Sequence, residues 1–312
     1  MLKTAAVRVA ATVTGAALLL CAPASAREII VYGGEQVASA GIKLYAWGSG
    51  KASQNTEKGV TTTNSIEVTS GGLYAGGFLS FQNPIEIAGP AAIGRYDYLE
   101  FVINFKSLTR LALDSYNKAP TGNGEYRPLP YDFYGNYYDD DPIMVPKARN
   151  LRVVLTSADG KSLGHMQAIV NKAGDEEGWF TVAVPLAALG LNEQTGGFAL
   201  SRLGVSLDFP DTFWIGRIRV ITDESPIYVD PMDEQTVGSG DTLVMKAEAE
   251  AGITSLVYSW DFNAADGIQE DAVGQLAEMM YKTAGTFTVT LTVRDPDGIK
   301  KPVTTKVKIE VT

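Results

Sequence analysis

Short runs of apolar residues recur along the chain, and each run is bounded by Gly, Pro, Asn or Asp. Alternating or β-branched runs of this kind are typical of strands with one buried face. The pattern predicts strands at 28–32, 65–69, 99–105, 151–156, 179–184, 203–207 and 215–221. Long helical periodicity is absent, and only 184–191 and 273–280 could carry a short helical turn. Many short strands without intervening helices predict an all-β fold built from β-sandwiches.

The clearest alternation lies near the C-terminus, where 286–293 places four apolar side chains on one face and four Thr on the other. A turn at 295–298 and a return strand at 303–311 follow. Polar, Pro-containing breaks at 223–226 and 230–231 interrupt the strand pattern. They predict one domain over 27–224 and a second over 225–312.

The C-terminal motifs resemble a known family. Tyr258-Ser-Trp-Asp-Phe262, then Tyr281, then Ala284-Gly-Thr-Phe287 and the alternating strand are similar to a PKD (polycystic kidney disease) domain. The resemblance implies an immunoglobulin-like β-sandwich that acts as a spacer or interaction module of an extracellular protein. It also implies that Trp260 packs in the core and that Asp261 ties down a loop. The family usually continues with Gly-Asp-Gly, where this chain has a longer segment at 263–267.

The N-terminal motifs resemble another family. Gly-rich strands at 65–78 are followed by YDYLEFVIN at 96–104, LRVVL at 151–155, WFTVAVPLAALG at 179–190 and a closing strand at 215–220. This order is similar to the galactose-binding-like jelly roll of many carbohydrate-binding modules. The resemblance implies a jelly-roll β-sandwich that binds glycans. The family's closing strand often carries an Asp where Gly216 and Arg217 stand here, which argues against an inherited cation site.

A long insertion at about 115–142 holds six of the chain's 14 Tyr: Tyr116, Tyr126, Tyr131, Tyr134, Tyr137 and Tyr138. Such rings stack on pyranose rings, form protein interfaces, or bury one another in a folded-back loop, and these interpretations stay open. Three Trp residues are candidates as well. Each of the three, Trp47, Trp179 and Trp214, fits a core position better than a ligand platform. Trp214 follows a loop-like run at 208–213, so it is the one best placed for exposure and the candidate ligand contact.

Composition narrows the chemistry. The 312 residues include one Cys and one His, too few for a Cys/His zinc site, and a Ser-His-Asp triad could use only His165, which is expected to be structural. The net charge of −10 and pI of about 4.7 argue against nucleic acid as a partner. Asp139, Asp140 and Asp141 could hold a structural Ca²⁺, although a solvated acidic loop is favoured. No other cofactor is expected, and no carboxylate pair for hydrolysis stands out.

The first 26 residues have the pattern of a secretory signal peptide. Lys3 and Arg8 precede an apolar stretch at 10–20, and Ala24-Ser-Ala26 forms a cleavage site. Cleavage would remove the only Cys and take the net charge from −10 to −12. A retained anchor or a lipoprotein signal at Cys21 are the alternatives. No later apolar run reaches the length of a transmembrane helix, so a secreted, cell-surface or periplasmic location is expected.

Together these features predict an exported, non-catalytic carbohydrate-binding protein. Its jelly roll would contact glycan, and its PKD-like domain would act as a spacer or docking module. The alternative is a structural or adhesive cell-envelope protein that binds another protein through the Tyr-rich loop. A hydrolase is a third, less favoured interpretation.

Overall fold

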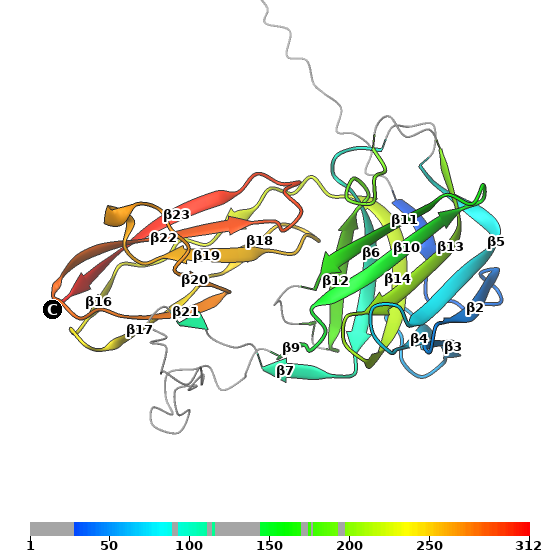
Figure 1. The fold of residues 1–312 in the computed structure, drawn as a ribbon, viewed down its shortest axis with the longest axis horizontal. Coiled ribbons are helices and arrows are strands. Elements are labelled where there is room, and N and C mark those ends of the chain that lie inside the picture. The colour runs from blue at the N-terminus through cyan, green and yellow to red at the C-terminus, as the bar shows by residue number, and fades with distance from the viewer. Residues whose placement is uncertain are drawn as a thin grey trace, which may run out of the picture.

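The computed structural model describes residues 28–88, 93–110, 114–115, 144–169, 174–175, 177–192 and 197–312. The chain forms two elongated lobes placed end to end, with the C-terminus at the far tip of the second lobe (Figure 1). Both lobes are built from strands, and among the described residues the one helical element is the 3-10 turn Ala264–Asp266. The predicted all-β fold of two β-sandwiches is confirmed.

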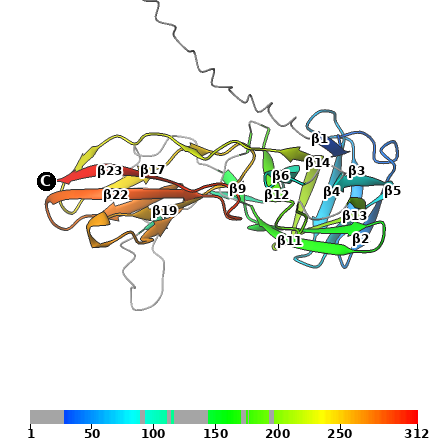
Figure 2. The ribbon, with the colours of Figure 1, turned by 90° about the horizontal axis from the view of Figure 1, so that it is seen from above.

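Two sheets face each other in the N-terminal jelly roll, as Figure 2 shows from above. The sheet nearer the viewer in Figure 1, which we name the front sheet, has the strand order β11 (Ser162–Ala168), β10 (Asn150–Ser157), β13 (Phe198–Leu207), β5 (Gly76–Ala88) and β2 (Ile42–Trp47). The back sheet has the order β12 (Trp179–Pro185), β6 (Asp97–Phe105), β14 (Asp211–Thr222), β4 (Ser65–Ser70) and β3 (Lys51–Asn55), and β1 (Glu28–Tyr32) pairs with β14.

Alternation along these strands produces the core between the two sheets. In β10, Leu151, Val153 and Leu155 are fully buried, while the intervening side chains are half-buried on the outer face. The equivalent inward positions of β13, β14 and β6 belong to the same apolar cluster. All seven predicted strands are confirmed. One detail is wrong: β14 begins at Asp211, so the end of the expected loop at 208–213 is a strand.

A five-stranded sheet forms one layer of the C-terminal domain. Its order is β16 (Gln235–Val237), β23 (Val303–Val311), β22 (Gly285–Arg294), β19 (Val257–Asp261) and β20 (Ala272–Val273). The other strands are β17 (Thr242–Lys246) beside β21 (Leu276–Met280), and β15 (Tyr228–Val229) beside β18 (Ala249–Glu250). The possible helical turn at 273–280 is wrong, because β20 and β21 complete ladders with β19 and β17.

A second, separate cluster of buried side chains fills the C-terminal domain around Trp260. The Trp260 indole is fully buried and donates its N–H to the carbonyl oxygen of Gly274 at 2.8 Å. Asp261 accepts the backbone N–H of Asn263 at 2.9 Å, so both predicted roles are confirmed. The predicted boundary at 224–225 lies between the two clusters, after Val220 and before Ile227.

The insertion leaves the N-terminal domain through a two-stranded ribbon of β7 (Leu108–Arg110) and β9 (Met144–Pro146). Between them, β8 (Asp114–Ser115) pairs in parallel with β21 of the C-terminal domain. The first residues of the insertion therefore join a sheet of the other domain, which the sequence does not predict.

Candidate functional site

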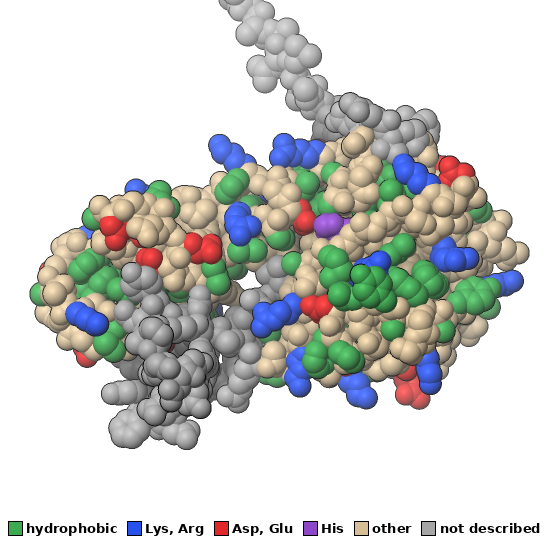
Figure 3. Space-filling model, in the orientation of Figure 1, with side chains coloured by type: hydrophobic (Ala, Val, Ile, Leu, Met, Phe, Trp, Pro, Cys, Tyr) green, Lys and Arg blue, Asp and Glu red, His purple; other side chains and the backbone are tan. Residues whose placement is uncertain are grey.

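The front sheet carries a connected set of aromatic and arginine side chains on its outer face. We name it the aromatic–arginine ladder, and it consists of Arg202, Phe78, Trp47, Arg152 and Tyr74. In the view of Figure 3, hydrophobic side chains gather over this sheet, with Lys and Arg side chains beside them.

Each member of the ladder contacts the next. The rings of Trp47 and Phe78 stack with centroids 4.9 Å apart, and the Arg202 guanidinium lies 5.5 Å from the Phe78 ring centroid. The Arg152 guanidinium lies 5.0 Å from the ring centroid of Trp47 and 4.2 Å from that of Tyr74. Cation–π contacts of this length are attractive, so they stabilise this arrangement of the side chains.

Strand register explains how these side chains meet. Tyr45 of β2 lies opposite Phe78 of β5, Phe78 lies opposite Gly204 of β13, and Gly204 lies opposite Val154 of β10. A Cβ atom at Gly204 would approach the Phe78 ring to 2.6 Å. The absence of a side chain at Gly204 therefore creates the space in which the Phe78 ring lies against the sheet.

The ladder is partly open to solvent, and hydrogen bonds from the sheet hold the turn that carries its Tyr74. Tyr74 of the ladder is 71% exposed, and Tyr45, which lies opposite Phe78 and outside the ladder, is 51% exposed, whereas Trp47 and Phe78 are half-buried. Arg152 Nη1 donates to the carbonyl oxygen of Leu73 at 3.0 Å, and the Ser206 hydroxyl donates to the same oxygen at 2.8 Å. These bonds hold the turn that carries Tyr74 against the sheet. Exposed aromatic rings with fixed polar neighbours are typical of binding surfaces.

The expectation that Trp47 belongs to the core is wrong. Trp47 is half-buried on the outer face, because β2 directs Ile42 and Leu44 inward and Lys43, Tyr45 and Trp47 outward. The local signal was present in the sequence, since IKLYAW at 42–47 alternates over its first four residues.

Trp214, the predicted ligand contact, lies on the outer face of the back sheet, apart from the ladder. Its indole N–H donates to Glu67 Oε2 at 3.0 Å, and Lys58 Nζ lies 4.1 Å from its ring centroid. Lys58 also donates to Asn104 Oδ1 at 2.6 Å, and partial burial lowers the pKa of its ammonium. Trp214 is half-buried, so one of its ring faces and its polar atom are already used within the protein. Its ligand-binding role stays a prediction.

The packing of the back sheet leaves space only for Gly at position 216. The Val60 methyl group and the Trp179 ring would lie 2.5 Å and 3.0 Å from a Cβ atom at this position, so a side chain has no space there. Trp179 is 5% exposed, and its expected burial is confirmed.

Neighbouring arginines on the back sheet are paired with acids. Arg219 binds Glu100 and donates from Nη1 to Glu28 Oε1 at 2.7 Å, while Arg217 Nη2 lies 3.5 Å from Glu100 Oε2. Hydrogen bonds to Glu100 raise the pKa of Arg219 above its ordinary value. Arg217 and Arg219 thus both have acidic partners on the back sheet.

His165, the one histidine of the chain, lies on the edge strand β11, and its expected structural role stays a prediction. Its Nε2 lies 3.5 Å from Asp297 Oδ1 in the turn between β22 and β23, and Gln167 Nε2 donates to Asp297 Oδ2 at 3.0 Å. These contacts join the two domains.

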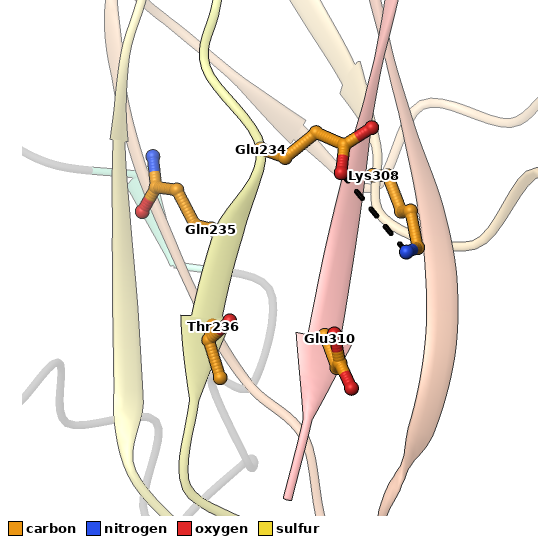
Figure 4. A pocket seen from close by; sticks show the side chains of 5 residues that line it. All are labelled: Glu234, Gln235, Thr236, Lys308 and Glu310. Carbon is orange, nitrogen blue, oxygen red and sulfur yellow. Dashed lines mark ion pairs between the residues drawn. The ribbon is translucent and has the colours of Figure 1, made fainter.

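A shallow pocket of about 50 Å³ lies on the C-terminal domain between β16 and β23 (Figure 4). Its lining side chains are Glu234, Gln235, Thr236, Lys308 and Glu310. Lys308 Nζ lies 4.0 Å from Glu234 Oε2, and both side chains are largely exposed. A small polar depression of this kind offers little apolar surface to a ligand.

Other predicted site residues lie outside the described part of the chain: Tyr116, Tyr126, Tyr131, Tyr134, Tyr137, Tyr138, Asp139, Asp140 and Asp141. Residues 1–26 do as well. The described residues contain no group of His, Cys, Asp and Glu that could hold a metal ion. None of their helices is long and apolar enough to cross a membrane.

Two of the solved structures that match parts of this chain are the following. The first holds the CBM22-1-GH10 modules of the Clostridium thermocellum endo-1,4-beta-D-xylanase 10B complexed with xylohexaose. This match has 7% sequence identity and a TM-score of 0.33, and it covers 64% of this chain and 31% of that chain. The second holds Dpr2 Ig1-Ig2 in complex with DIP-Theta Ig1-Ig3, with 11% identity and a TM-score of 0.24, and covers 55% of this chain and 59% of that one. This chain therefore spans less than two thirds of either.

A search of curated proteins gives no match. A family model described as "PKD domain" matches residues 223–311. The resemblance of the C-terminal region to PKD domains is therefore confirmed.

Proposed function

We propose that this protein is an exported, non-catalytic carbohydrate-binding protein, and that the aromatic–arginine ladder is its glycan-binding surface. The observation that carries the proposal is the set of aromatic rings on the outer face of the front sheet, where Trp47 and Phe78 stack and where Tyr74 and the neighbouring Tyr45 are more than half exposed. Aromatic rings pack against the apolar faces of sugar rings, and Arg N–H groups donate to sugar hydroxyls. The PKD-type domain serves as a spacer or docking module.

Binding of the purified protein to a panel of soluble polysaccharides, measured by affinity electrophoresis, tests the proposal. Tyr45→Ala and Trp47→Ala should each weaken binding at least about tenfold, as expected for central aromatic contacts. Tyr228→Ala is the matched control, because Tyr228 is 53% exposed and lies in the C-terminal domain. Unchanged affinity in the two front-sheet variants would contradict the assignment of the site.

Two further measurements separate the alternatives. Trp214→Phe tests the back-sheet candidate, and we expect a smaller effect than for Trp47→Ala because the Trp214 indole N–H is already bonded to Glu67. Affinity purification tests the adhesive alternative, since aromatic and Arg side chains also mark protein interfaces. A stoichiometric protein partner, combined with no affinity for any polysaccharide, would favour an envelope-protein role.

A further inference from the structure

The glycan-facing surface carries unusual charge for an acidic chain. Three successive rows of residues cross the front sheet on its outer face, and they include Lys43, Arg152 and Arg202 but no Asp or Glu. The chain as a whole has 36 acidic and 26 basic residues. Glu86, farther along β5, accepts the backbone N–H of Phe198 at 2.7 Å. Positive charge is therefore concentrated where the aromatic rings are exposed.

The cations flank an apolar row. Lys43 of β2 and Arg202 of β13 lie in the same cross-strand row, with Ser80 of β5 between them. Their backbones are therefore two strand spacings apart, a distance of about 10 Å. Arg152 of β10 lies two rows away from Arg202, because Arg202 is opposite Thr156 of the same strand. Four residues of strand rise separate the two rows, a distance of about 13 Å. Between these rows runs the one that contains Tyr45, Phe78 and Val154. An extended ligand on the apolar row would have cations on both sides.

These arginines have no acidic partner within the described residues. Arg152 uses one donor for the carbonyl oxygen of Leu73, and no ion pair joins Arg152 or Arg202 to a described carboxylate. A guanidinium has five N–H donors, so several remain for a ligand. The back sheet provides the contrast, because its Arg219 is held by Glu28 and Glu100. An arginine without a carboxylate partner among the described residues, placed beside exposed rings, fits a carboxylate or sulfate better than a neutral hydroxyl.

We propose that the front sheet selects acidic polysaccharides. The apolar faces of the sugar rings pack along the row of Tyr45 and Phe78, and anionic groups of the polymer accept hydrogen bonds from Arg202 and Lys43 on one side and from Arg152 on the other. The inference rests on the proposed function, since it takes the ladder to be the glycan site.

The test compares polymers with the same backbone and different charge. Polygalacturonate is set against its fully methyl-esterified form, and dextran sulfate against dextran, which separates carboxylate from sulfate recognition. We expect at least about tenfold tighter binding of one charged polymer than of its neutral counterpart, as expected for a charge-assisted hydrogen bond. Arg202→Gln should remove most of this preference, and added salt should weaken the charged complex. Arg294→Gln, an exposed site on the C-terminal domain, is the control.

Each outcome has a distinct meaning. Equal affinity for the charged and neutral polymers, or an unchanged preference for the charged polymer in Arg202→Gln, overturns the selection for acidic glycans. The proposed function still stands in that case if Trp47→Ala weakens polysaccharide binding. Binding of poly-L-glutamate as tight as that of the acidic polysaccharides also overturns it, because the face would then recognise acidic protein segments. Failure to bind any polysaccharide overturns the proposed function itself.

Discussion

Lys300 Nζ donates to Asp223 Oδ2 at 2.8 Å, and both side chains are buried, at 2% and 9% exposure. Asp223 directly follows β14 of the N-terminal domain, whereas Lys300 lies between β22 and β23 of the C-terminal domain. The same ammonium donates to the carbonyl oxygen of Ala251 at 2.7 Å. A buried ion pair therefore ties the connecting segment to the C-terminal domain and, with the contacts of Asp297, restricts how the two domains move.

Lys300→Met should destabilise the protein strongly. Removing one partner leaves the other charge buried without compensation, which costs about 3–5 kcal/mol in the free energy of unfolding. Urea unfolding monitored by tryptophan fluorescence measures this change. Lys308→Met is the control, because Lys308 is exposed and lies 4.0 Å from its acidic neighbour, so its loss should cost less than about 1 kcal/mol. Equal effects of the two substitutions would show that the buried pair adds nothing.

Acid should weaken the same junction. Burial alone would raise the pKa of Asp223, but hydrogen bonds from Lys300, Ser225 and Ile253 outweigh it and hold the pKa below its ordinary value. Such a group adds stability above its unfolded-state pKa and loses it as the pH falls through the folded-state pKa. The free energy of unfolding should therefore decline below about pH 4, the ordinary range of Asp. Urea titrations at several pH values should give a shallower decline for Asp223→Asn.

Asp297→Ala should loosen the contact between β11 and the turn after β22. The Gln167 side chain is 1% exposed and donates to Asp297, so the variant leaves a buried amide without its acceptor, at a cost of about 1–3 kcal/mol. Thermal unfolding measures the loss, and small-angle X-ray scattering measures the spread of domain arrangements. Asp297→Asn keeps an oxygen acceptor and should lose less. An alanine variant as stable as the asparagine variant would contradict this role.

Most strands of the fold could be predicted from local patterns in the sequence. The alternation in β10 and the motif around Trp260 both reflect which side chains a single strand must bury, and that information is contained in neighbouring residues. The turn at Gly298, whose φ is 67° and whose N–H donates to the Asp295 carbonyl oxygen, was likewise predicted from the Asp297-Gly298 pair. These elements are therefore predictable without knowledge of their partners.

The site depends on residues far apart in the chain. Phe78 reaches its position because Gly204 lies opposite it, and no local pattern relates these two residues. Trp47 was expected in the core because its residue type is usually buried, whereas the alternation along β2 directs its side chain outward. The Lys300–Asp223 pair likewise joins segments 77 residues apart. The pairing of distant strands decides the Gly204–Phe78 contact, and the packing of the two domains decides the Lys300–Asp223 pair; sequence alone specifies neither.

Gly204→Ala should disrupt the ladder without unfolding the domain. The new methyl group would lie 2.6 Å from the Phe78 ring, closer than atoms can approach, so the ring must move away from the sheet and from Trp47. We expect a changed Trp fluorescence spectrum and at least about tenfold weaker binding of polysaccharide, because the stacked surface is no longer in place. Gly164→Ala is a matched control in the same row: its methyl group would meet its nearest neighbours at 3.8 Å, an ordinary contact. Equal polysaccharide affinity in the two variants would show that the position of the Phe78 ring does not matter for binding.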